Sequence, residues 1–277
     1  MTKEAIVPLI SGAMAGMCVD LTLFPIDTIK TRLQSDAGFW RSGGFRHIYS
    51  GLMSTMIGSA PNAAIFFLSY ETSKSSLKSL ISTKYEPIVH MMSASVGEVT
   101  ACLVRVPVEV IKQRAQASQG LIGGQQRPQT SGQIFRQTIS REGFRGLYRG
   151  YLSTIVREIP FSLIQFPVWE YLKKRWIAHQ NHQPLNAIQS TVCGAVAGGC
   201  SALLTTPLDL AKTRIMLAET GAAFSIRDIA IVLKMIYTQN GVFGLFTGAV
   251  PRVVHISIGG AIFLGGYDII SNFLHSL

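Results

Sequence analysis

The chain has 277 residues, of which 48% are hydrophobic and only 14% are charged, and its mean hydropathy is +0.31. A soluble globular domain carries roughly a quarter of charged residues, so this composition excludes an ordinary soluble domain and indicates a membrane protein. The formal charge of +10 favours an anionic membrane surface or anionic ligands over nucleic acid, because the bases are scattered among apolar segments without a zinc-finger spacing or a basic region.

The amino-terminal stretch MTKEAIVPLISG is neither an Arg-rich transit peptide nor a basic segment followed by a cleavage site, so no removable leader is predicted. An apolar run from Val7 to Phe24 follows and ends in FPIDTIKTRLQ, which brings a proline, a carboxylate and two bases into the run. The four cysteines stand inside apolar runs and lack CxxC or Cys/His spacing, so neither a disulfide framework nor a metal site is predicted.

The motif that begins at Pro25 occurs three times along the chain. PIDTIKTR at 25 to 32 is repeated as PVEVIKQR at 107 to 114 and as PLDLAKTR at 207 to 214. Each copy keeps the proline, an acid two residues on, a lysine five on and an arginine seven on. Three copies of a four-position pattern predict an internal repeat, which we assign to residues 1–84, 85–184 and 185–277.

Two further elements recur after each motif. EGFRGLYRG at 142 to 150 has weaker counterparts at 43 to 51 and 240 to 248, and an aromatic-acid pair follows at 70–71, 169–170 and 267–268. In every repeat the acid stands 20 residues after the closing glycine at 51, 150 or 248. A helix of that length spans about 30 Å, the thickness of the hydrocarbon core of a bilayer.

Six transmembrane helices are therefore predicted, two in each repeat. They cover the apolar runs Val7–Phe24, Leu52–Ser69, Ile88–Val106, Leu152–Trp169, Ala187–Thr206 and Ala249–Gly266. Within the links, residues 134–144 and 226–241 carry apolar side chains at helical spacing, which predicts a short amphipathic helix on the membrane surface in each link.

The acid and the lysine of one motif copy stand three residues apart and could simply pair on one helix face. Threefold pseudo-symmetry instead puts three acids and three lysines at one depth of a bundle, where unpaired charges are costly. We therefore predict a ring in which each acid meets a base of a neighbouring repeat and closes one end of a central cavity.

The triple P-x-[DE]-x-x-[KR]-x-[RK] pattern resembles the signature of the mitochondrial carrier family over the whole chain. The resemblance implies an all-α membrane protein of the mitochondrial inner membrane, with six tilted transmembrane helices in three pseudo-threefold repeats around a central cavity, short amphipathic matrix helices, alternating access and a functional monomer. It implies a matrix gate that pairs Asp27 with Lys112, Glu109 with Lys212 and Asp209 with Lys30, braced by Gln34 and Gln116. The third brace position holds Met216, so two braces are expected.

The same resemblance implies a cytoplasmic gate made of Glu71, Lys74, Glu170, Lys173 and Asp268. Ser271 stands where a third base is expected, so at most two pairs can close that end, Glu71 with Lys173 and Asp268 with Lys74. It also implies bound cardiolipin at YRG, 148 to 150, and its degenerate copies, against the amino ends of the even-numbered helices. Basic side chains of the links, Arg149 among them, are expected at the matrix surface, where anionic headgroups bind.

Charges in the spans that the repeat does not require point to the cargo: Asp20, Glu98, Arg105, Arg157 and Glu158. Helix periodicity places Asp20 and Glu98 on the cavity side of their helices. Arg157 and Glu158 are assigned to the cavity by the family resemblance, and Phe161 and Asn62 complete the candidate binding set. An arginine for a carboxylate and surplus acids for cationic groups suit an amino-acid-like cation.

Whole stretches of the chain, such as GEVTACLVRVPVEVIKQRAQ, resemble the members of the family that carry S-adenosylmethionine. This implies import of S-adenosylmethionine in exchange for S-adenosylhomocysteine. A carrier for a basic amino acid or for another nucleotide-like cofactor is the alternative that the residue chemistry leaves open. A soluble helical repeat protein is disfavoured by the continuous apolar spans, and an enzyme by the lack of a P-loop, G-x-S-x-G, HExxH or GxGxxG motif.

Overall fold

The computed structural model describes residues 3–80, 86–117, 119–122, 125–180, 185–218 and 226–275. The side chains of 3–13, 79–80, 86–88, 90–91, 119–122, 125–128, 187, 226 and 263–275 lie outside the description. The elements are α1 Lys3–Gln34, α2 Gly38–Arg41, α3 Leu52–Leu80, α4 Glu86–Ala117, β1 Gln119–Ile122, β2 Gln125–Pro128, α5 Ser131–Leu147, α6 Tyr151–His179, α7 Ala187–Leu204, α8 Thr206–Leu217, α9 Ile226–Leu245 and α10 Ala249–His275. The described chain is helical apart from one antiparallel hairpin, β1–β2, which the sequence did not predict.

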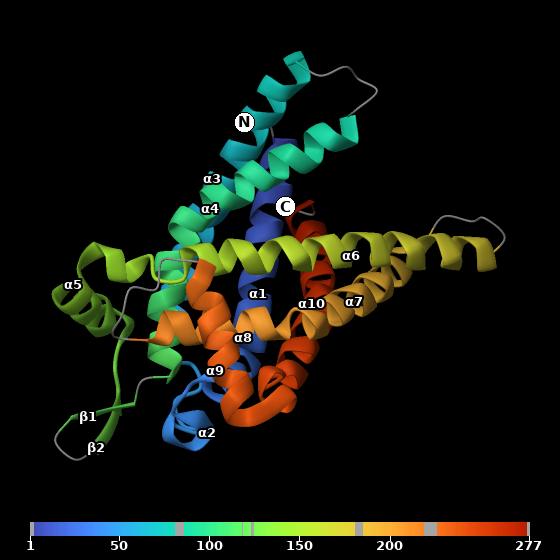
Figure 1. The fold of residues 1–277 in the computed structure, drawn as a ribbon. Coiled ribbons are helices and arrows are strands. Elements are labelled where there is room, and N and C mark those ends of the chain that lie inside the picture. The colour runs from blue at the N-terminus through green and yellow to red at the C-terminus, as the bar shows by residue number, and fades with distance from the viewer. Residues whose placement is uncertain are drawn as a thin grey trace.

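The long helices meet at a common centre, from which α3–α4 and α6–α7 extend in different directions (Figure 1). Helix α3 packs along α4, α6 along α7, and α10 along both α1 and α7. The predicted apolar runs lie on these six helices, except that the fifth run continues past α7 to Thr206 at the start of α8. The contacts α3–α4, α6–α7 and α1–α10 each join helices of different repeats. The pairs converge near the three motifs, where side chains such as Thr28, Val110 and Leu210 are fully buried. The core of the molecule therefore lies around the motifs.

The motif proline does not break the helix in the first two repeats. Helix α1 continues through Pro25 to Gln34, and α4 continues through Pro107 to Ala117. In the third repeat α7 ends at Leu204 and α8 begins at Thr206, with a bend of 64° between them. Pro207 falls in the first turn of α8, where a missing N–H leaves no helical hydrogen bond unmade.

The links between paired spans differ in their helices. The amphipathic helices predicted for 134–144 and 226–241 are present within α5 and α9. The first link is shorter and contains only the one-turn helix α2, followed by turns up to Gly51. Helix α5 begins with a capping box, in which Thr130 Oγ1 accepts a hydrogen bond from the Gln133 N–H and the Gln133 side chain accepts one from the Thr130 N–H.

Among the described residues one helix, Leu52–Lys78, is long and apolar enough to cross a membrane by length and composition alone. The number rises to three if the bent pairs α7–α8 and α9–α10 each count as one span. The remaining long helices carry charged residues; α4, for example, contains Glu98, Arg105 and Glu109 in one stretch. Such charges lower the mean hydropathy of a helix even where only one of its faces is polar.

Candidate functional site

Three ion pairs join the motifs into a ring. Lys112 Nζ lies 2.7 Å from Asp27 Oδ2, Lys212 Nζ lies 2.7 Å from Glu109 Oε1, and Lys30 Nζ lies 2.7 Å from Asp209 Oδ2. Each lysine thus reaches the acid of another repeat rather than the acid of its own motif. These are the three pairings expected from the sequence, and they link α1, α4 and α8 to one another.

Two glutamines add hydrogen bonds to this ring. Gln116 Nε2 donates to Asp27 Oδ2 at 3.1 Å, and Gln34 Nε2 donates to Asp209 Oδ2 at 3.2 Å. Both glutamines are fully buried. At the third equivalent position Met216 packs in an apolar cluster with Cys102, Val106 and Val110. The glutamine bonds therefore occur at two of the three positions, as the sequence predicted.

The motif arginines form a second ring that the sequence analysis did not assign. Arg32 Nε donates to the carbonyl of Gln116, Arg114 Nε to that of Met216, and Arg214 Nε to that of Gln34. Each arginine thus binds the last turn of a helix from another repeat, where carbonyl groups lack helical partners. The regular spacing of this arginine in all three motifs was the available signal.

Arg149 does not occupy the matrix surface as expected. Its side chain is only 6% exposed, and its Nη2 lies 2.8 Å from Glu142 Oε2. The same carboxylate accepts from Arg114 Nη2 at 3.2 Å. Arg149 is held inward because Glu142 sits beneath it, so this arginine stabilises the link instead of facing headgroups.

The surplus charges of the spans pair with one another. Arg105 binds Glu98 on its own helix, and Arg105 Nη1 also lies 3.6 Å from Glu158 Oε1. Arg157 binds the neighbouring Glu158. Two carboxylates and two guanidinium groups from α4 and α6 therefore form one internally neutralised cluster. Glu98, Arg157 and Glu158 of the candidate binding set lie in this cluster, and Arg105 joins them without having been assigned to the set. Arg157 is not left free for a ligand carboxylate, because Glu158 already binds it.

Asp209 connects that cluster to the ring. Arg157 Nε lies 3.9 Å from Asp209 Oδ1, and Arg252 Nη1 lies 3.8 Å from Asp209 Oδ2, in addition to Lys30. Arg252 is 2% exposed, and its Nη2 donates to Thr205 Oγ1 at 2.9 Å. The sequence analysis missed Arg252 because neither of the other repeats has a base four residues after its closing glycine.

The remaining residues of the candidate binding set are Asp20, Asn62 and Phe161. Asp20 is half-buried on α1, and it makes no hydrogen bond or ion pair within the part of the chain that the structure describes. Asn62 on α3 holds a buried Oδ1 atom that accepts no hydrogen bond from the described residues. The Phe161 ring centroid lies 5.8 Å from the Arg157 guanidinium carbon. These groups add a carboxylate, an amide and an aromatic face to the candidate set.

The other end of the long helices is organised differently. Lys74 lies 3.7 Å from Glu71 on its own helix, and Lys174, not Lys173, lies 3.5 Å from Glu170. Lys173 instead lies over the Trp169 ring, 4.0 Å from its centroid. The expected contact between Glu71 and Lys173 is not formed in this arrangement. Asp268 falls among the side chains outside the description, so its pairing with Lys74 stays a prediction.

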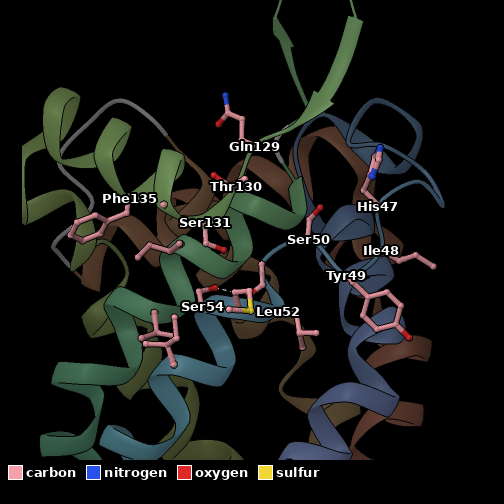
Figure 2. Close-up of a pocket in the computed structure, with 16 residues that line it drawn as sticks. His47, Ile48, Tyr49, Ser50, Leu52, Ser54, Gln129, Thr130, Ser131 and Phe135 are labelled. Carbon is pink, nitrogen blue, oxygen red and sulfur yellow. Dashed lines mark hydrogen bonds between the residues drawn. The ribbon is translucent and has the colours of Figure 1, made fainter.

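A pocket of about 890 Å³ lies between the amino ends of α3 and α5. Figure 2 shows Ser50, Leu52 and Ser54 near the start of α3 gathered close to Thr130 and Ser131 at the start of α5. Gly51 precedes α3 with a φ of 91°, which a residue with a side chain adopts only with strain. The N–H groups of Leu52 and Ser54 already bond to the carbonyls of Tyr49 and Gly51, and that of Gln133 bonds to Thr130. The positive ends of two helix dipoles nevertheless meet at this pocket, which favours an anion.

Comparison with known proteins places the chain among relatives of one kind. Residues 2–80, 83–180 and 183–277 each match the family described as "Mitochondrial carrier protein". The chain is 53% identical to the "Mitochondrial S-adenosylmethionine carrier protein" of Danio rerio, with 96% of each chain covered. It is 54% identical to the protein of that name from Xenopus tropicalis, with 96% and 95% covered, and 54% identical to the "S-adenosylmethionine mitochondrial carrier protein homolog" of Drosophila melanogaster, with 96% and 92% covered.

Proposed function

The chain belongs to the mitochondrial carrier family, and from this premise we propose that it imports S-adenosylmethionine into the matrix in exchange for S-adenosylhomocysteine. As a member of the family it is a transporter rather than an enzyme, and a multi-pass protein of the mitochondrial inner membrane. The substrate assignment rests on the identity of about 53%, over 96% of the chain, to carriers named for S-adenosylmethionine.

The charged side chains that meet on α4 and α6, together with Asp20, support the same substrate. S-adenosylmethionine carries a sulfonium, an ammonium, a carboxylate and an adenine. Its two cationic groups would be received by Glu98, Glu158 and Asp20, the last of which has no partner among the described residues. Arg157 would take the carboxylate after release from Glu158, and Phe161 would stack on the adenine or on a cation.

The three-pair ring is proposed as the matrix gate of an alternating-access transporter with six tilted spans. In this arrangement the ring is closed by the pairs at 2.7 Å, with the Gln34 and Gln116 braces in place. Away from the ring, α3–α4 and α6–α7 extend in different directions, while α10 packs along both α1 and α7 (Figure 1). This arrangement therefore corresponds to the carrier open toward the cytoplasm, and a single chain with one central cavity would work as a monomer.

We expect Glu71 and Lys173 to meet when the cytoplasmic end closes. Reversing one charge, as in Glu71→Lys, should lower the exchange rate roughly fivefold, because an exposed pair contributes about 1 kcal/mol. Lys173→Glu in the same chain should restore the rate, since it recreates the pair with opposite polarity. Exchange assays on the two single variants and the double variant measure this. If the double variant exchanged more slowly than either single variant, the pairing of Glu71 with Lys173 would be contradicted.

The anion-suited pocket at the starts of α3 and α5 is proposed as a cardiolipin site (Figure 2). A lipid phosphate would lie at the positive dipole ends of both helices. The acyl chains would lie along Ile57, Val108 and Phe135, which line the pocket. Gly150 and Gly248 hold the equivalent positions directly before α6 and α10, and their φ angles are also positive.

The substrate assignment is tested by uptake into proteoliposomes. Vesicles loaded with S-adenosylhomocysteine should take up labelled S-adenosylmethionine, and empty vesicles should take up much less. Labelled arginine and labelled ATP are tested as alternative substrates. Arginine carries a positive charge as S-adenosylmethionine does, whereas ATP is anionic. Uptake of arginine without uptake of S-adenosylmethionine would replace the proposal by a basic amino-acid carrier.

A further inference from the structure

The second motif differs from the other two at the residue between its lysine and its arginine. The first and third motifs have Thr31 and Thr213 there, whereas the second has Gln113. Thr31 Oγ1 donates to Gln116 Oε1 at 2.8 Å, and Thr213 Oγ1 donates to Gln34 Oε1 at 2.9 Å. Each threonine thus orients the amide whose nitrogen reaches the carboxylate of the same motif.

Met216 occupies the place of the third glutamine without its hydrogen bonds. A methyl group added at Gly248 would meet Gln34 Cγ at 3.0 Å, and one added at Gly150 would meet Met216 Cγ at 2.9 Å. The two side chains therefore approach equivalent closing glycines in the same way. A thioether has no donor, so Met216 cannot bond to Glu109 as Gln34 bonds to Asp209.

Gln113 supplies the hydrogen bond to Glu109 that Met216 cannot make, and it does so from the same helix as Glu109. Its Nε2 atom donates to Glu109 Oε1 at 3.0 Å, while Lys212 Nζ donates to Glu109 Oε2 at 2.8 Å. Gln113 follows Glu109 by one helical turn on α4, so the contact lies within one helix. The Gln113 Oε1 atom is buried and has no hydrogen-bond partner among the described residues. Only the nitrogen end of this amide is used.

We propose that Gln113 is a positioning residue that replaces the missing brace and holds Glu109 toward Lys212 when the matrix gate is closed. The inference rests on the proposed gate. Unlike Gln34 and Gln116, Gln113 ties no second repeat to its own, because both bonded groups belong to α4. The junction between α4 and α8 therefore lacks the amide bond between repeats that the other two junctions have.

The test exchanges the two side chains of this junction. Gln113→Thr removes the brace, and Gln113→Thr combined with Met216→Gln recreates the threonine-glutamine arrangement of the other two positions. Met216→Leu is the matched control, because it changes the same buried position without adding or removing a hydrogen-bonding amide. All variants are purified as full chains and reconstituted.

Two measurements test the role of Gln113 separately from the identity of the substrate. The first is efflux of labelled S-adenosylmethionine into buffer without counter-substrate, where repeated turnover requires the empty carrier to open its ring. Gln113→Thr should raise this efflux about tenfold, as expected for loss of a hydrogen bond to a charged group. The double variant should return to within about twofold of the unaltered chain, and Met216→Leu should not change it. The second readout is the melting temperature in detergent without any substrate, which should fall for Gln113→Thr and recover in the double variant.

Each outcome decides a separate question. Recovery in the double variant supports the brace, since a merely structural loss at Gln113 would not be repaired from another helix. Unchanged efflux and melting in Gln113→Thr, or a double variant that remains as impaired as the single one, would overturn it. If the unaltered chain does not move S-adenosylmethionine, the cargo is wrong, and the melting series alone decides the brace.

Discussion

Asp209→Asn is expected to lower the melting temperature of the protein in detergent by about 10 °C. Asp209 is the one acid of the ring with three cations near it: Lys30 at 2.7 Å, Arg157 at 3.9 Å and Arg252 at 3.8 Å. Its side chain is 6% exposed, so water cannot replace the lost carboxylate. Removing one partner of a buried ion pair costs about 3–5 kcal/mol, and about 2–4 °C of melting temperature corresponds to each kcal/mol in a chain of this size.

A matched control is available in the same region. Asp36 also binds an arginine, with its Oδ1 atom 2.7 Å from Arg214 Nη1, but its side chain is 60% exposed. Asp36→Asn should shift the melting temperature by no more than about 3 °C, because an exposed pair contributes about 1 kcal/mol or less. Equal shifts for the two variants, measured by a thermal dye assay, would show that burial and the cationic cluster around Asp209 do not set its contribution.

The ring could be predicted from the sequence because symmetry supplied the missing information. One copy of the motif is compatible with a local pair between Asp27 and Lys30, but three copies place equivalent charges at one depth, and the pairing between repeats follows. The brace positions came instead from the family resemblance. Gln34 and Gln116 stand at one offset from their prolines, and Met216 marks the exception.

Features without a threefold counterpart could not be predicted in this way. Arg252 has none, and its burial against Asp209 depends on how α10 packs against α1 and α7. The bond between Arg105 and Glu98 was missed because helix periodicity assigns a face and not a partner. The break at Thr205 also stands alone, since α1 and α4 pass their motif prolines unbroken. In each case the outcome is decided by contacts between distant segments.

Glu158→Gln is expected to reduce S-adenosylmethionine exchange by about 30- to 100-fold. Glu158 lies between Arg157 and Arg105 and is the carboxylate that both guanidinium groups share. Without it, the cavity loses an anion that would face the substrate cation, and both arginines would repel that cation. A hydrogen bond to a charged group contributes about 1.5–3 kcal/mol, and about 2–3 kcal/mol corresponds to the expected loss in rate.

The expected loss is specific to the cluster and not to charge on α6 as such. Lys174 lies on the same helix, is 77% exposed and binds only Glu170 among the described ion pairs. Lys174→Gln should therefore leave exchange within about twofold of the unaltered rate. Arg157→Ala should lower the exchange rate as Glu158→Gln does, because the proposed carboxylate contact is lost and Glu158 loses its bound base. Folded Glu158→Gln and Arg157→Ala proteins that exchange at the normal rate would exclude this cluster as the substrate site, while the ring of Asp27, Glu109 and Asp209 would remain the proposed gate.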